Sequence, residues 1–597
     1  MARPNKEVEA LLQEYADLVS ITGGDAYRAR AYEKAARAIG GYPTDVSRLD
    51  AKRLREIPNV GKSIADKVEE YVRTGQVAAV EDVRAQIPAG VRELIAIPTL
   101  GPKKAMALYQ ELHIRSVDEL ADAIAAHKLR ELKGFGPKTE ENILHGITLM
   151  HSAGDRVQIG VAMELAEDIV TAMEKVTGCE QCTYAGSLRR MKETIGDIDI
   201  LVAAEDSAPF MDAFTRLPYA GEVIAHGEKK TSLRTHRGLS VDLRVVPPDS
   251  WGAALQYFTG SKAHNIRTRE LAVHQKLKLS EYGLFHAGSG SESGQKIVST
   301  TEEEVYARLG LPWIPPTLRE DRGEIAAGLR GELPELVTDA DIRGDLHTHT
   351  DLTDGMGTLE QMIAAAAGRG YAYYAITDHA PDLSMQRMTD EKILQQQQAI
   401  QRLDGLNGLA RPHKRMRLLH GTELNIGPEG GVDWPEEFLA GFDLCVASIH
   451  SHFNQDRDTL TRRLIRACEH PYVNIIGHPT ARHIGKRPPV DIDLDALFAA
   501  CARTGTALEI NGQPERLDLS DENITRAKRH GVKFAINSDA HSTLHLGYVR
   551  YGVGTAQRAW LAADDVINTW PLGRLRQFLR KDCLREGRTS RPAGGKE

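Results

Sequence analysis

The sequence predicts a multidomain protein in which an all-helical N-terminal region precedes two mixed α/β regions. Residues 1–150 contain amphipathic helical runs around three similar glycine turns, and from about residue 155 strand and helix patterns mix. Beyond residue 342, short apolar strands alternate with helices, which implies a parallel sheet or a barrel. The length of 597 residues allows roughly four domains at about 150 residues each.

The composition is that of a soluble globular chain. Hydrophobic residues make up 41% and charged residues 26%, which excludes a wholly disordered protein. No apolar run approaches the roughly 18 residues of a membrane span, and no signal-peptide core follows the first residues. The six scattered cysteines favour a reducing cytoplasm. The net charge of −8 at pH 7 weighs only weakly against nucleic acid, because binding depends on where charge lies.

The helical region contains a weak internal repeat. The segments IPNVGKSIADKV, IPTLGPKKAMAL and LKGFGPKTEENI each place a glycine turn before a helix. Such a turn exposes backbone N–H groups that can bind phosphate, and glycine permits close approach. The segments resemble helix-hairpin-helix motifs, which bind the nucleic-acid backbone without reading its sequence. A single copy would suit any helical bundle, but three copies favour DNA binding at Gly61, Gly101 and Gly136.

The first α/β region contains three acidic residues in strand-like segments. Asp197 and Asp199 lie two apart, so both carboxylates project from one face of a strand. Asp242 lies in a second apolar segment that can pair alongside, and three converging carboxylates can hold two Mg²⁺ ions for phosphoryl transfer. The alternative is a solvated edge strand. Upstream, Gly186, Ser187 and Arg190 offer donors for a triphosphate.

Two longer segments of this region resemble the X family of DNA polymerases. GSLRRMKETIGDID resembles the family's nucleotidyltransferase signature, and YFTGSKAHNIRTR resembles its nucleotide pocket. The resemblance implies that Asp197, Asp199 and Asp242 hold two Mg²⁺ or Mn²⁺ ions and that Asp242 helps to deprotonate the primer 3′-hydroxyl. The implied nucleotide-binding residues are Gly186, Ser187, Arg190, Tyr257, Phe258, Gly260, Asn265 and Arg269.

Three positions depart from the polymerase beta pattern or match it only in part. Met191 stands where that branch has glycine, and Ser240 stands where it has a basic residue near Asp242. Lys67 aligns with the lysine that forms a Schiff base with an abasic sugar. Its neighbours match incompletely, since Arg28 and Lys34 fit but Glu33 and Ser63 replace basic residues. A solvated helix lysine is therefore the favoured interpretation of Lys67, and lyase activity is the alternative.

The last region concentrates histidine, with thirteen of the 22 histidines between His347 and His545. Histidine is the commonest metal ligand, although chance clustering on a surface is the alternative. Potential ligands follow each expected strand, and ends of successive parallel strands meet on one face of a barrel. The nine candidate ligands are His347, His349, Asp354, His379, Glu423, His450, His478, Asp539 and His541. Nine ligands exceed the need of one ion and fit two or three Zn²⁺ or Mn²⁺ ions.

These nine residues resemble the motifs of the PHP (polymerase and histidinol phosphatase) family. The resemblance implies one subsite of His347, His349, Glu423 and Asp539, with Glu423 bridging toward a second subsite. It implies that His450 and His478 belong to the second, and that Asp354, His379 and His541 form the third. The other histidines, such as His452, His483 and His545, are expected to line the cleft without binding metal, and the pair Cys179 and Cys182 is read as incidental.

The resemblance covers nearly the whole chain and divides it into seven parts. The expected order is a lyase-like helical domain at 1–85, a second helix-hairpin-helix subdomain at 86–151, a nucleotidyltransferase palm at 152–248, a nucleotide-binding subdomain at 249–318, a linker at 319–341, a PHP domain forming a distorted (β/α)7 barrel at 342–580, and a tail at 581–597.

The implied function is template-directed DNA synthesis at short gaps in base-excision or break repair, with 3′→5′ exonuclease or phosphoesterase activity in the barrel. Gapped or nicked DNA and deoxynucleoside triphosphates are the expected partners, with no membrane partner. We expect a monomer in the cytoplasm, associated with the nucleoid. Two alternatives remain: a DNA-end-binding scaffold with an inactive barrel, and a barrel that acts as a small-molecule phosphatase of the histidinol-phosphate kind.

Overall fold

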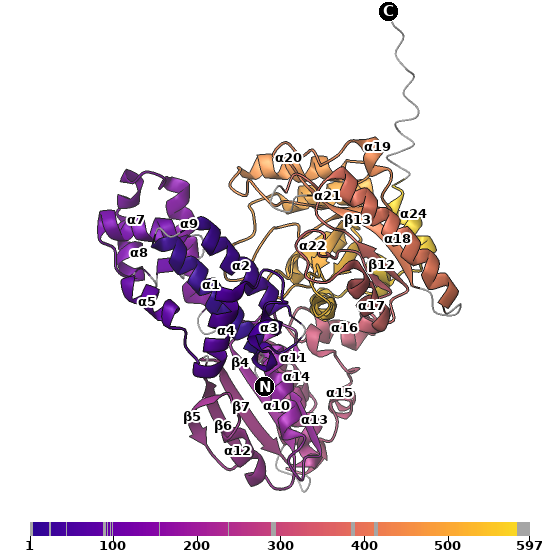
Figure 1. The fold of residues 1–597 in the computed structure, drawn as a ribbon. Coiled ribbons are helices and arrows are strands. Elements are labelled where there is room, and N and C mark those ends of the chain that lie inside the picture. The colour runs from indigo at the N-terminus through magenta and orange to yellow at the C-terminus, as the bar shows by residue number, and fades with distance from the viewer. Residues whose placement is uncertain are drawn as a thin grey trace, which may run out of the picture.

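In the computed structural model the chain forms a helical N-terminal region, a central α/β region and a C-terminal barrel (Figure 1). The structure describes residues 4–22, 25–42, 44–87, 91, 94–95, 97, 100–153, 156–236, 238–287, 294–383, 388–410 and 416–581. None of the described helices is both long enough and apolar enough to cross a membrane.

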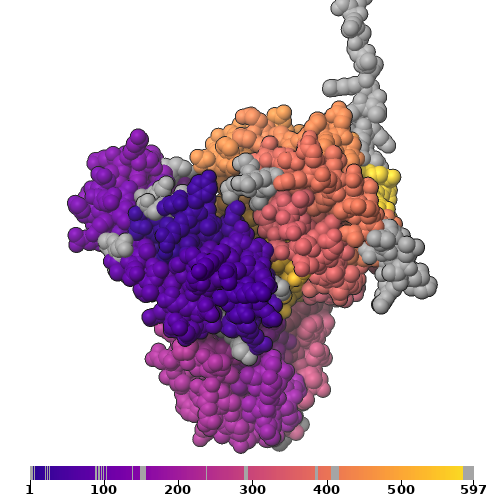
Figure 2. Space-filling model, viewed as in Figure 1, coloured from indigo at the N-terminus to yellow at the C-terminus, as the bar shows by residue number. Residues whose placement is uncertain are grey.

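The N-terminal region is entirely helical in its described part, as the sequence predicts. Its helices are α1 (Pro4–Ile21), α2 (Ala26–Gly40), η1 (Val46–Arg48), α3 (Ala51–Leu54), α4 (Lys62–Thr74), α5 (Ala78–Gln86), α7 (Pro102–Leu112), α8 (Val117–Ala125), η2 (Lys128–Glu131) and α9 (Pro137–Ala153). One continuous core runs from Val8 to Ile147, so the two helix-hairpin-helix parts pack as a unit. Figure 2 shows this region lying against the barrel, and Met356 of the barrel packs on its core.

The central region is built on a five-stranded sheet in the order β2-β4-β7-β6-β5. Its elements are β1 (Val157–Gln158), α10 (Ile159–Met173), β2 (Gln181–Tyr184), α11 (Gly186–Arg189), β3 (Thr194–Ile195), β4 (Asp197–Ala203), α12 (Ala208–Thr215), β5 (Ala220–His226), β6 (Lys230–Thr235) and β7 (Ser240–Val246). Apolar residues of α10 and α12 cover one face of the sheet. Strand β2 ends at Tyr184, because Gly186 takes a left-handed φ of 61° and begins the short helix α11.

A smaller subdomain follows this sheet. It consists of η3 (Pro248–Ser250), α13 (Trp251–Thr259), α14 (Lys262–His274), β8 (Leu277–Ser280), β9 (Gly283–His286), β10 (Lys296–Val298), α15 (Glu302–Arg308), η4 (Pro316–Leu318) and α16 (Glu324–Arg330). The segment expected to be a linker, 319–341, contains α16 and the 3₁₀ helix η5 (Asp339–Asp341). Its Glu324 is fully buried, 2.6 Å from His264 Nδ1 in α14, so this part of the segment is packed on the subdomain.

The C-terminal region is a parallel barrel of seven strands in sequential order, β11 to β17. The strands are β11 (Gly344–Asp345), β12 (Tyr373–Ile376), β13 (Arg417–Asn425), β14 (Leu444–Ser448), β15 (Ile475–Ile476), β16 (Ala507–Asn511) and β17 (Phe534–Asn537). The helices are α17 (Leu359–Gly368), α18 (Asp390–Ala410), α19 (Glu436–Leu439), α20 (Arg457–Cys468), α21 (Leu494–Thr504), α22 (Asp521–Arg529), η7 (His545–Tyr548), α23 (Val549–Arg558), η8 (Ala563–Asp565), η9 (Ile567–Thr569) and α24 (Leu572–Leu579).

The barrel is nearly closed, which explains how its strand ends meet. The bridge between Thr348 and Ala540 brings the residues after β11 beside those after β17. The strands are buried on both faces, as expected of parallel strands covered by helices. The alternation of strands and helices read from the sequence is therefore confirmed as a single barrel, with all strand carboxyl ends on one side.

Candidate active sites

Strands β4 and β7, which are inner neighbours in the central sheet, bring three aspartates together. The two strands are parallel neighbours, and Asp199 lies directly opposite Asp242. Asp197 lies on the same face as Asp199, two residues earlier in β4. Asp197 is exposed, whereas Asp199 and Asp242 are half-buried. The predicted carboxylate cluster is therefore formed, with one side open to solvent.

The carboxylates repel one another in the absence of a cation. Burial, and then the charges of Asp197 and Asp242, raise the pKa of Asp199 to about 6. Lys230 of β6 provides one positive charge, with Nζ 2.7 Å from Asp242 Oδ2. Arg244 of β7 also lowers the pKa of Asp199, but burial and the two aspartates outweigh both cations. Such a cluster favours divalent cations, because hard cations prefer oxygen ligands and remove the repulsion. The donor set thus fits the Mg²⁺ or Mn²⁺ pair implied by the resemblance.

The glycine turn predicted to bind phosphate lies against this cluster. A Cβ atom on Gly186 would lie 2.5 Å from Asp199 Oδ2, and its φ of +61° is one that other residues rarely adopt. Glycine is therefore required here both by space and by conformation. Ser187 Oγ is buried and makes no hydrogen bond to any described residue, as expected of a donor whose partner is a ligand.

Arg190 is held at the end of the same turn. Its Nε donates to Glu320 Oε1 at 3.0 Å and its Nη1 to the carbonyl of Thr259 at 2.6 Å. Its Nη2 donates to no described residue. A Cβ on Gly260 would lie 3.2 Å from Arg190 Nη1, so the predicted triphosphate and sugar residues adjoin one another.

The remaining predicted nucleotide residues lie on α13 and α14. The rings of Tyr257 and Phe258 contact edge to face with centroids 5.1 Å apart. Asn265 is buried, and its side chain donates to the carbonyl of Tyr257 at 2.7 Å and accepts from Gln256 at 2.9 Å. Arg269 is exposed on α14, with Nε 3.1 Å from the Asn265 carbonyl. Of these two, only Arg269 offers its side chain to the surface.

The three repeat glycines lie at the starts of helices, as predicted. Gly61 and Gly101 are the N-caps of α4 and α7, and Gly136 precedes α9. None of them has a left-handed φ, and a Cβ on any of them would meet nothing within 4 Å. Neither conformation nor internal crowding therefore requires glycine at these positions, and the space before each helix is open.

Lys67 lies in a polar and aromatic niche of the N-terminal region. Its Nζ donates to Ser63 Oγ at 3.2 Å and lies 5.8 Å and 5.7 Å from the ring centroids of Tyr15 and Tyr32. Arg28 also contacts Tyr15, with Nη2 2.5 Å from Tyr15 Oη. Lys67 is therefore half-buried rather than fully solvated. Its Schiff-base role stays a prediction of the resemblance.

The barrel brings all nine predicted ligands to one end. Glu423 lies at the centre, 1% exposed, with carboxylate oxygens close to five imidazoles. Its Oε2 lies 2.9 Å from His379 Nδ1, 3.4 Å from His347 Nε2 and 3.6 Å from His349 Nε2, and its Oε1 lies 3.2 Å from His450 Nε2 and 3.1 Å from His478 Nε2. The two oxygens of Glu423 thus face different sets of imidazoles, which is the arrangement that a bridging carboxylate requires.

Two further carboxylates complete the site. Asp539 Oδ1 lies 3.2 Å from His349 Nε2 and 3.8 Å from His347 Nε2. Asp354 lies 3.4 Å from both His379 Nε2 and His541 Nε2 through its two oxygens. Three groups have atoms close enough to hold an ion: one of His349, Asp354, His379 and His541; one of His347, His349 and Asp539; and one of His379, Glu423 and His450. These groups overlap with the three implied subsites only in part, because His478 belongs to none of them and His379 also joins Glu423 and His450.

The geometry of these nitrogen atoms fits metal coordination. His347 Nε2, His349 Nε2 and His379 Nδ1 are buried and make no hydrogen bond, although carboxylate oxygens lie within 4 Å. Buried polar atoms are rarely left without a hydrogen bond unless a ligand binds them. Burial disfavours charge on His347, but Glu509, Glu423 and Asp539 raise its pKa well above the usual value. A buried set of histidine and carboxylate ligands suits Zn²⁺ or Mn²⁺.

Several residues around the barrel site were missed by sequence reasoning. Glu509 accepts from His347 Nδ1 at 2.7 Å and from the His478 backbone N–H at 2.7 Å, and both contacts orient ligands. Asn425 contacts His450 Nδ1 at 2.7 Å, and Asn511 donates to Asp539 at 3.0 Å. The sequence signal for Glu509 was a glutamate within the apolar segment TALEIN. The structure shows that this position is fully buried, where a charged side chain needs a partner.

Other candidates belong to none of the potential metal groups among the described residues, although His545 Nδ1 accepts from the His541 backbone N–H at 3.4 Å. Burial raises the pKa of the thiols of Cys179 and Cys182, and neither belongs to a potential metal group among the described residues. His452 is exposed and contacts Ser451, while His545 stacks on Tyr548 with ring centroids 4.8 Å apart.

Comparison with known families matches four parts of the chain. Models for a helix-hairpin-helix domain match residues 3–77, and those for a SAM-like helix-hairpin-helix tandem match 91–147. The model for the DNA polymerase beta thumb matches 254–320, and that for the PHP domain matches 345–513.

Comparison with curated proteins covers the chain almost completely. The chain is 34% identical over 580 residues to the DNA polymerase/3′-5′ exonuclease PolX of Bacillus subtilis (strain 168), which covers 97% of this chain and 99% of that protein. It is 26% identical over 322 residues to DNA polymerase lambda of Rattus norvegicus, covering 50% of this chain and 53% of that protein. It is 28% identical over 253 residues to a probable phosphatase of Thermoanaerobacter sp. (strain X514), covering 40% of this chain and 94% of that protein. The chain therefore belongs to the PolX group of X-family DNA polymerases, with helix-hairpin-helix motifs and a C-terminal PHP domain.

Proposed function

We propose that this chain is a DNA-directed DNA polymerase that fills short gaps during DNA repair and trims DNA 3′ ends in its barrel. The observation that carries the proposal is the presence of two separately built sites in one chain. One is the aspartate cluster beside the Gly186 turn, and the other is the nine-ligand barrel site. The name of the Bacillus subtilis relative includes both a DNA polymerase and a 3′-5′ exonuclease.

In the polymerase site, each residue has a role that follows from its position. Asp197, Asp199 and Asp242 hold two Mg²⁺ or Mn²⁺ ions, which would stabilise the charge of the transferred phosphoryl group. Asp242 accepts the proton of the primer 3′-hydroxyl. The Ser187 hydroxyl and the open Nη2 of Arg190 donate to the triphosphate of the incoming nucleotide.

The rest of the nucleotide pocket follows the turn between α13 and α14. Tyr257, Phe258 and Gly260 lie at the sugar, where the chain backbone excludes a 2′-hydroxyl. Asn265 and Arg269 face the nascent base pair, and Arg269 already reaches the surface.

The helical region binds the DNA backbone. Gly61, Gly101 and Gly136 each leave open space before a helix, where backbone N–H groups and the helix dipole attract phosphate. Gapped or nicked DNA is the substrate that such sequence-independent contacts suit. We include in the proposal a monomeric state and a cytoplasmic, nucleoid-associated location.

The barrel acts as a metal-dependent phosphoesterase on DNA ends. Its buried ligands hold up to three Zn²⁺ or Mn²⁺ ions, which would lower the pKa of bound water for attack on phosphorus. The chain's own contribution is to fix the ligands, since Glu509 holds His347 and Asn425 holds His450.

The test uses the purified full chain, gapped DNA and Mg²⁺ or Mn²⁺. We expect addition of a templated nucleotide at a one-nucleotide gap and release of nucleotides from an unpaired 3′ end. Metal analysis of the same preparation checks the barrel, because the alternative of an inactive scaffold predicts no bound metal there. Absence of nucleotide addition with either metal contradicts the polymerase assignment.

The similarity to a probable phosphatase favours a second candidate for the barrel, a phosphatase that takes small phosphoesters. Competition distinguishes the two. If the barrel acts on DNA, an excess of a small phosphomonoester leaves 3′-end trimming nearly unchanged, whereas gapped DNA inhibits hydrolysis of the phosphomonoester.

A further inference from the structure

One face of helix α23, in the barrel, is docked on the polymerase half of the molecule. Arg550, Gly554 and Arg558 lie four residues apart, so they share that face. Arg550 contacts Glu167 of α10, with Nη1 2.8 Å from Oε1. Tyr551 of the same helix belongs to the core cluster of the central sheet.

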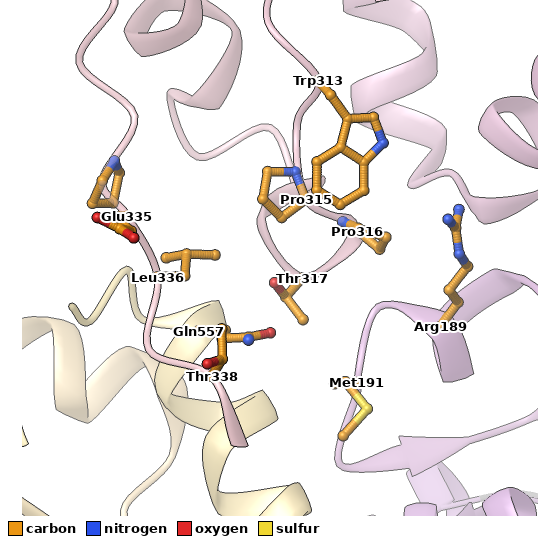
Figure 3. Close-up of a pocket in the computed structure, with 11 residues that line it drawn as sticks. Arg189, Met191, Trp313, Pro315, Pro316, Thr317, Glu335, Leu336, Thr338 and Gln557 are labelled. Atoms are coloured by element: carbon orange, nitrogen blue, oxygen red, sulfur yellow. The ribbon is translucent and has the colours of Figure 1, made fainter. Parts of the chain in front are cut away.

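Met191 connects this face to the phosphate-binding turn. It follows Arg190 directly and has a left-handed φ of 55°. A Cβ atom on Gly554 would lie 2.5 Å from Met191 Cε, so the methionine fills the space that glycine leaves on α23. Figure 3 shows Met191 at this junction, where the palm, the segment around Thr338 and the helix carrying Gln557 line a pocket of about 510 Å³.

Arg558 reaches the turn itself. It is 5% exposed, and its Nη1 donates to the backbone carbonyl of Arg190 and to Glu320 Oε1, both at 2.9 Å. The same carboxylate oxygen of Glu320 accepts from Arg190 Nε at 3.0 Å. Arg558 therefore contacts both the backbone of Arg190 and the carboxylate that orients its side chain.

The charges form a chain of alternating sign. Arg558 Nη2 lies 2.9 Å from Asp521 Oδ2, and that oxygen lies 3.0 Å from Arg322 Nη1. Burial raises the pKa of Glu320, but the charges of Arg190 and Arg558 lower it by more, so the pKa lies below its usual value. Arg322 also contacts Glu522, with Nη2 3.3 Å from Oε1, so three carboxylates match the three guanidinium groups. Arg190 and Arg558 share the single charge of Glu320, so Glu320 orients Arg190 without fully neutralising it.

We propose that Arg558 of the PHP barrel is a positioning residue for DNA synthesis, and that it acts through Glu320 and the Arg190 backbone to hold the Arg190 guanidinium toward the triphosphate. The proposal rests on the polymerase function and on the role of Arg190 proposed above. The barrel is then part of the nucleotide site and not only a second enzyme attached to it. The free Nη2 of Arg190 is the atom that this arrangement presents to a phosphate oxygen.

The experiment measures kcat and KM for the nucleotide on a one-nucleotide gap with the full chain. Loss of charge-assisted hydrogen bonds in R558A is expected to raise KM about tenfold, with kcat changed less than about threefold. R550A is the matched control, because Arg550 lies on the same face of α23 but contacts Glu167 rather than the turn. Its KM is expected to stay within about twofold of the wild type.

A conservative change and a double variant separate positioning from damage to the fold. R558K keeps a donor and should recover part of the KM, and E320Q should raise KM as R558A does. The double variant should be no worse than the worse single variant, because residues that act through one another are not additive. Exonuclease activity and thermal unfolding of each preparation check that the barrel is intact.

Two results overturn the proposal: an unchanged KM in R558A, or an equal rise in R550A, which would indicate general docking. If R558A does not fold, an unchanged KM in E320Q overturns it instead. A wild-type chain that adds no nucleotide overturns the polymerase function together with this role. A wild-type chain that polymerises beside R558A with an unchanged KM overturns this role alone.

Discussion

The two candidate sites differ chiefly in how complete they are within the chain. In the barrel, His347, Glu423 and Asp539 are all at most 4% exposed and are surrounded by other ligands. In the polymerase site, Asp197 is exposed and Asp199 and Asp242 are half-buried. A site that holds its metals inside the protein can be built from protein alone. A site that joins a primer to a nucleotide stays open, because substrates supply its remaining ligands.

Separate substitution of the two sites gives the largest expected effect. Replacing Asp197 and Asp199 by alanine is expected to lower synthesis on the order of a thousandfold, because several kcal/mol of metal-dependent stabilisation is lost. The same variant should retain 3′-end trimming. Replacing His347 and His349 by alanine should have the reverse effect. Gap filling and exonuclease assays on each preparation check both, and synthesis that survives the first change contradicts the assignment of these aspartates.

The second prediction concerns the pH dependence of stability in the polymerase half, where Glu302 is buried between two arginines. Glu302 accepts from Arg189 Nη2 at 2.8 Å and from Arg319 Nη1 at 2.5 Å. Burial raises its pKa, but Arg319 and Arg189 lower the pKa of Glu302 to about 2, from a usual value of 4.5. Since the folded-state pKa is depressed, this stabilisation is present above about pH 4.5 and is lost as the pH falls toward 2.

The corresponding variant is E302Q. It should lower the free energy of unfolding by roughly 3 kcal/mol at pH 7, and by much less near pH 3. The exposed neighbour Glu303 provides the control, E303Q, which should change little at either pH. Denaturant unfolding at the two pH values checks this. A deficit in E302Q that is the same at both values contradicts the pKa assignment.

Glu509 tests whether the barrel site depends on residues that bind no metal. E509Q is expected to lower 3′-end trimming and Zn²⁺ or Mn²⁺ affinity about 10- to 100-fold, because it weakens the hold on His347. Synthesis should be unchanged. E515Q is the control, since Glu515 lies nearby on the surface and contacts Lys486. Trimming that is unaffected in E509Q would remove Glu509 from the site.

The smallest effect is expected at the repeat glycines. Replacing Gly61, Gly101 and Gly136 together by alanine should weaken binding of gapped DNA several-fold, because three Cβ atoms enter the space left for phosphate. Thermal unfolding should shift only slightly, since nothing lies within 4 Å of these Cβ atoms. Gly368 of α17 has equally open space but lies in the barrel, so G368A should bind DNA as the wild type does. Equal weakening in both variants contradicts the role of the repeat.

Local patterns predicted much of the fold and both sites. Asp197 and Asp199 are visible because a strand places alternate residues on one face. The barrel ligands are visible because they lie after strands or, as for Glu423 in β13, near the carboxyl end of one. The pairing of Asp199 with Asp242 was predicted from the apolar character of both segments and is confirmed by the strand register.

What could not be predicted depends on contacts between distant parts of the chain. Glu509 meets His347 across 162 residues, and Arg558 meets Glu320 across 238. Neither contact leaves a motif, because ion pairs of this kind require no fixed spacing in sequence. The segment expected as a linker likewise gave no sign in its sequence of the buried contact between Glu324 and His264.

Met191 has a consequence for the history of the family. Met191 has a left-handed φ, a conformation that favours glycine, and the polymerase beta branch has glycine here. Another residue keeps this conformation only where the packing of its side chain offsets the strain. In this chain the methionine packs on Gly554 of the barrel. Residues 191 and 554 are therefore expected to vary together among relatives, and a lineage that lost its barrel would be free to return to glycine at position 191.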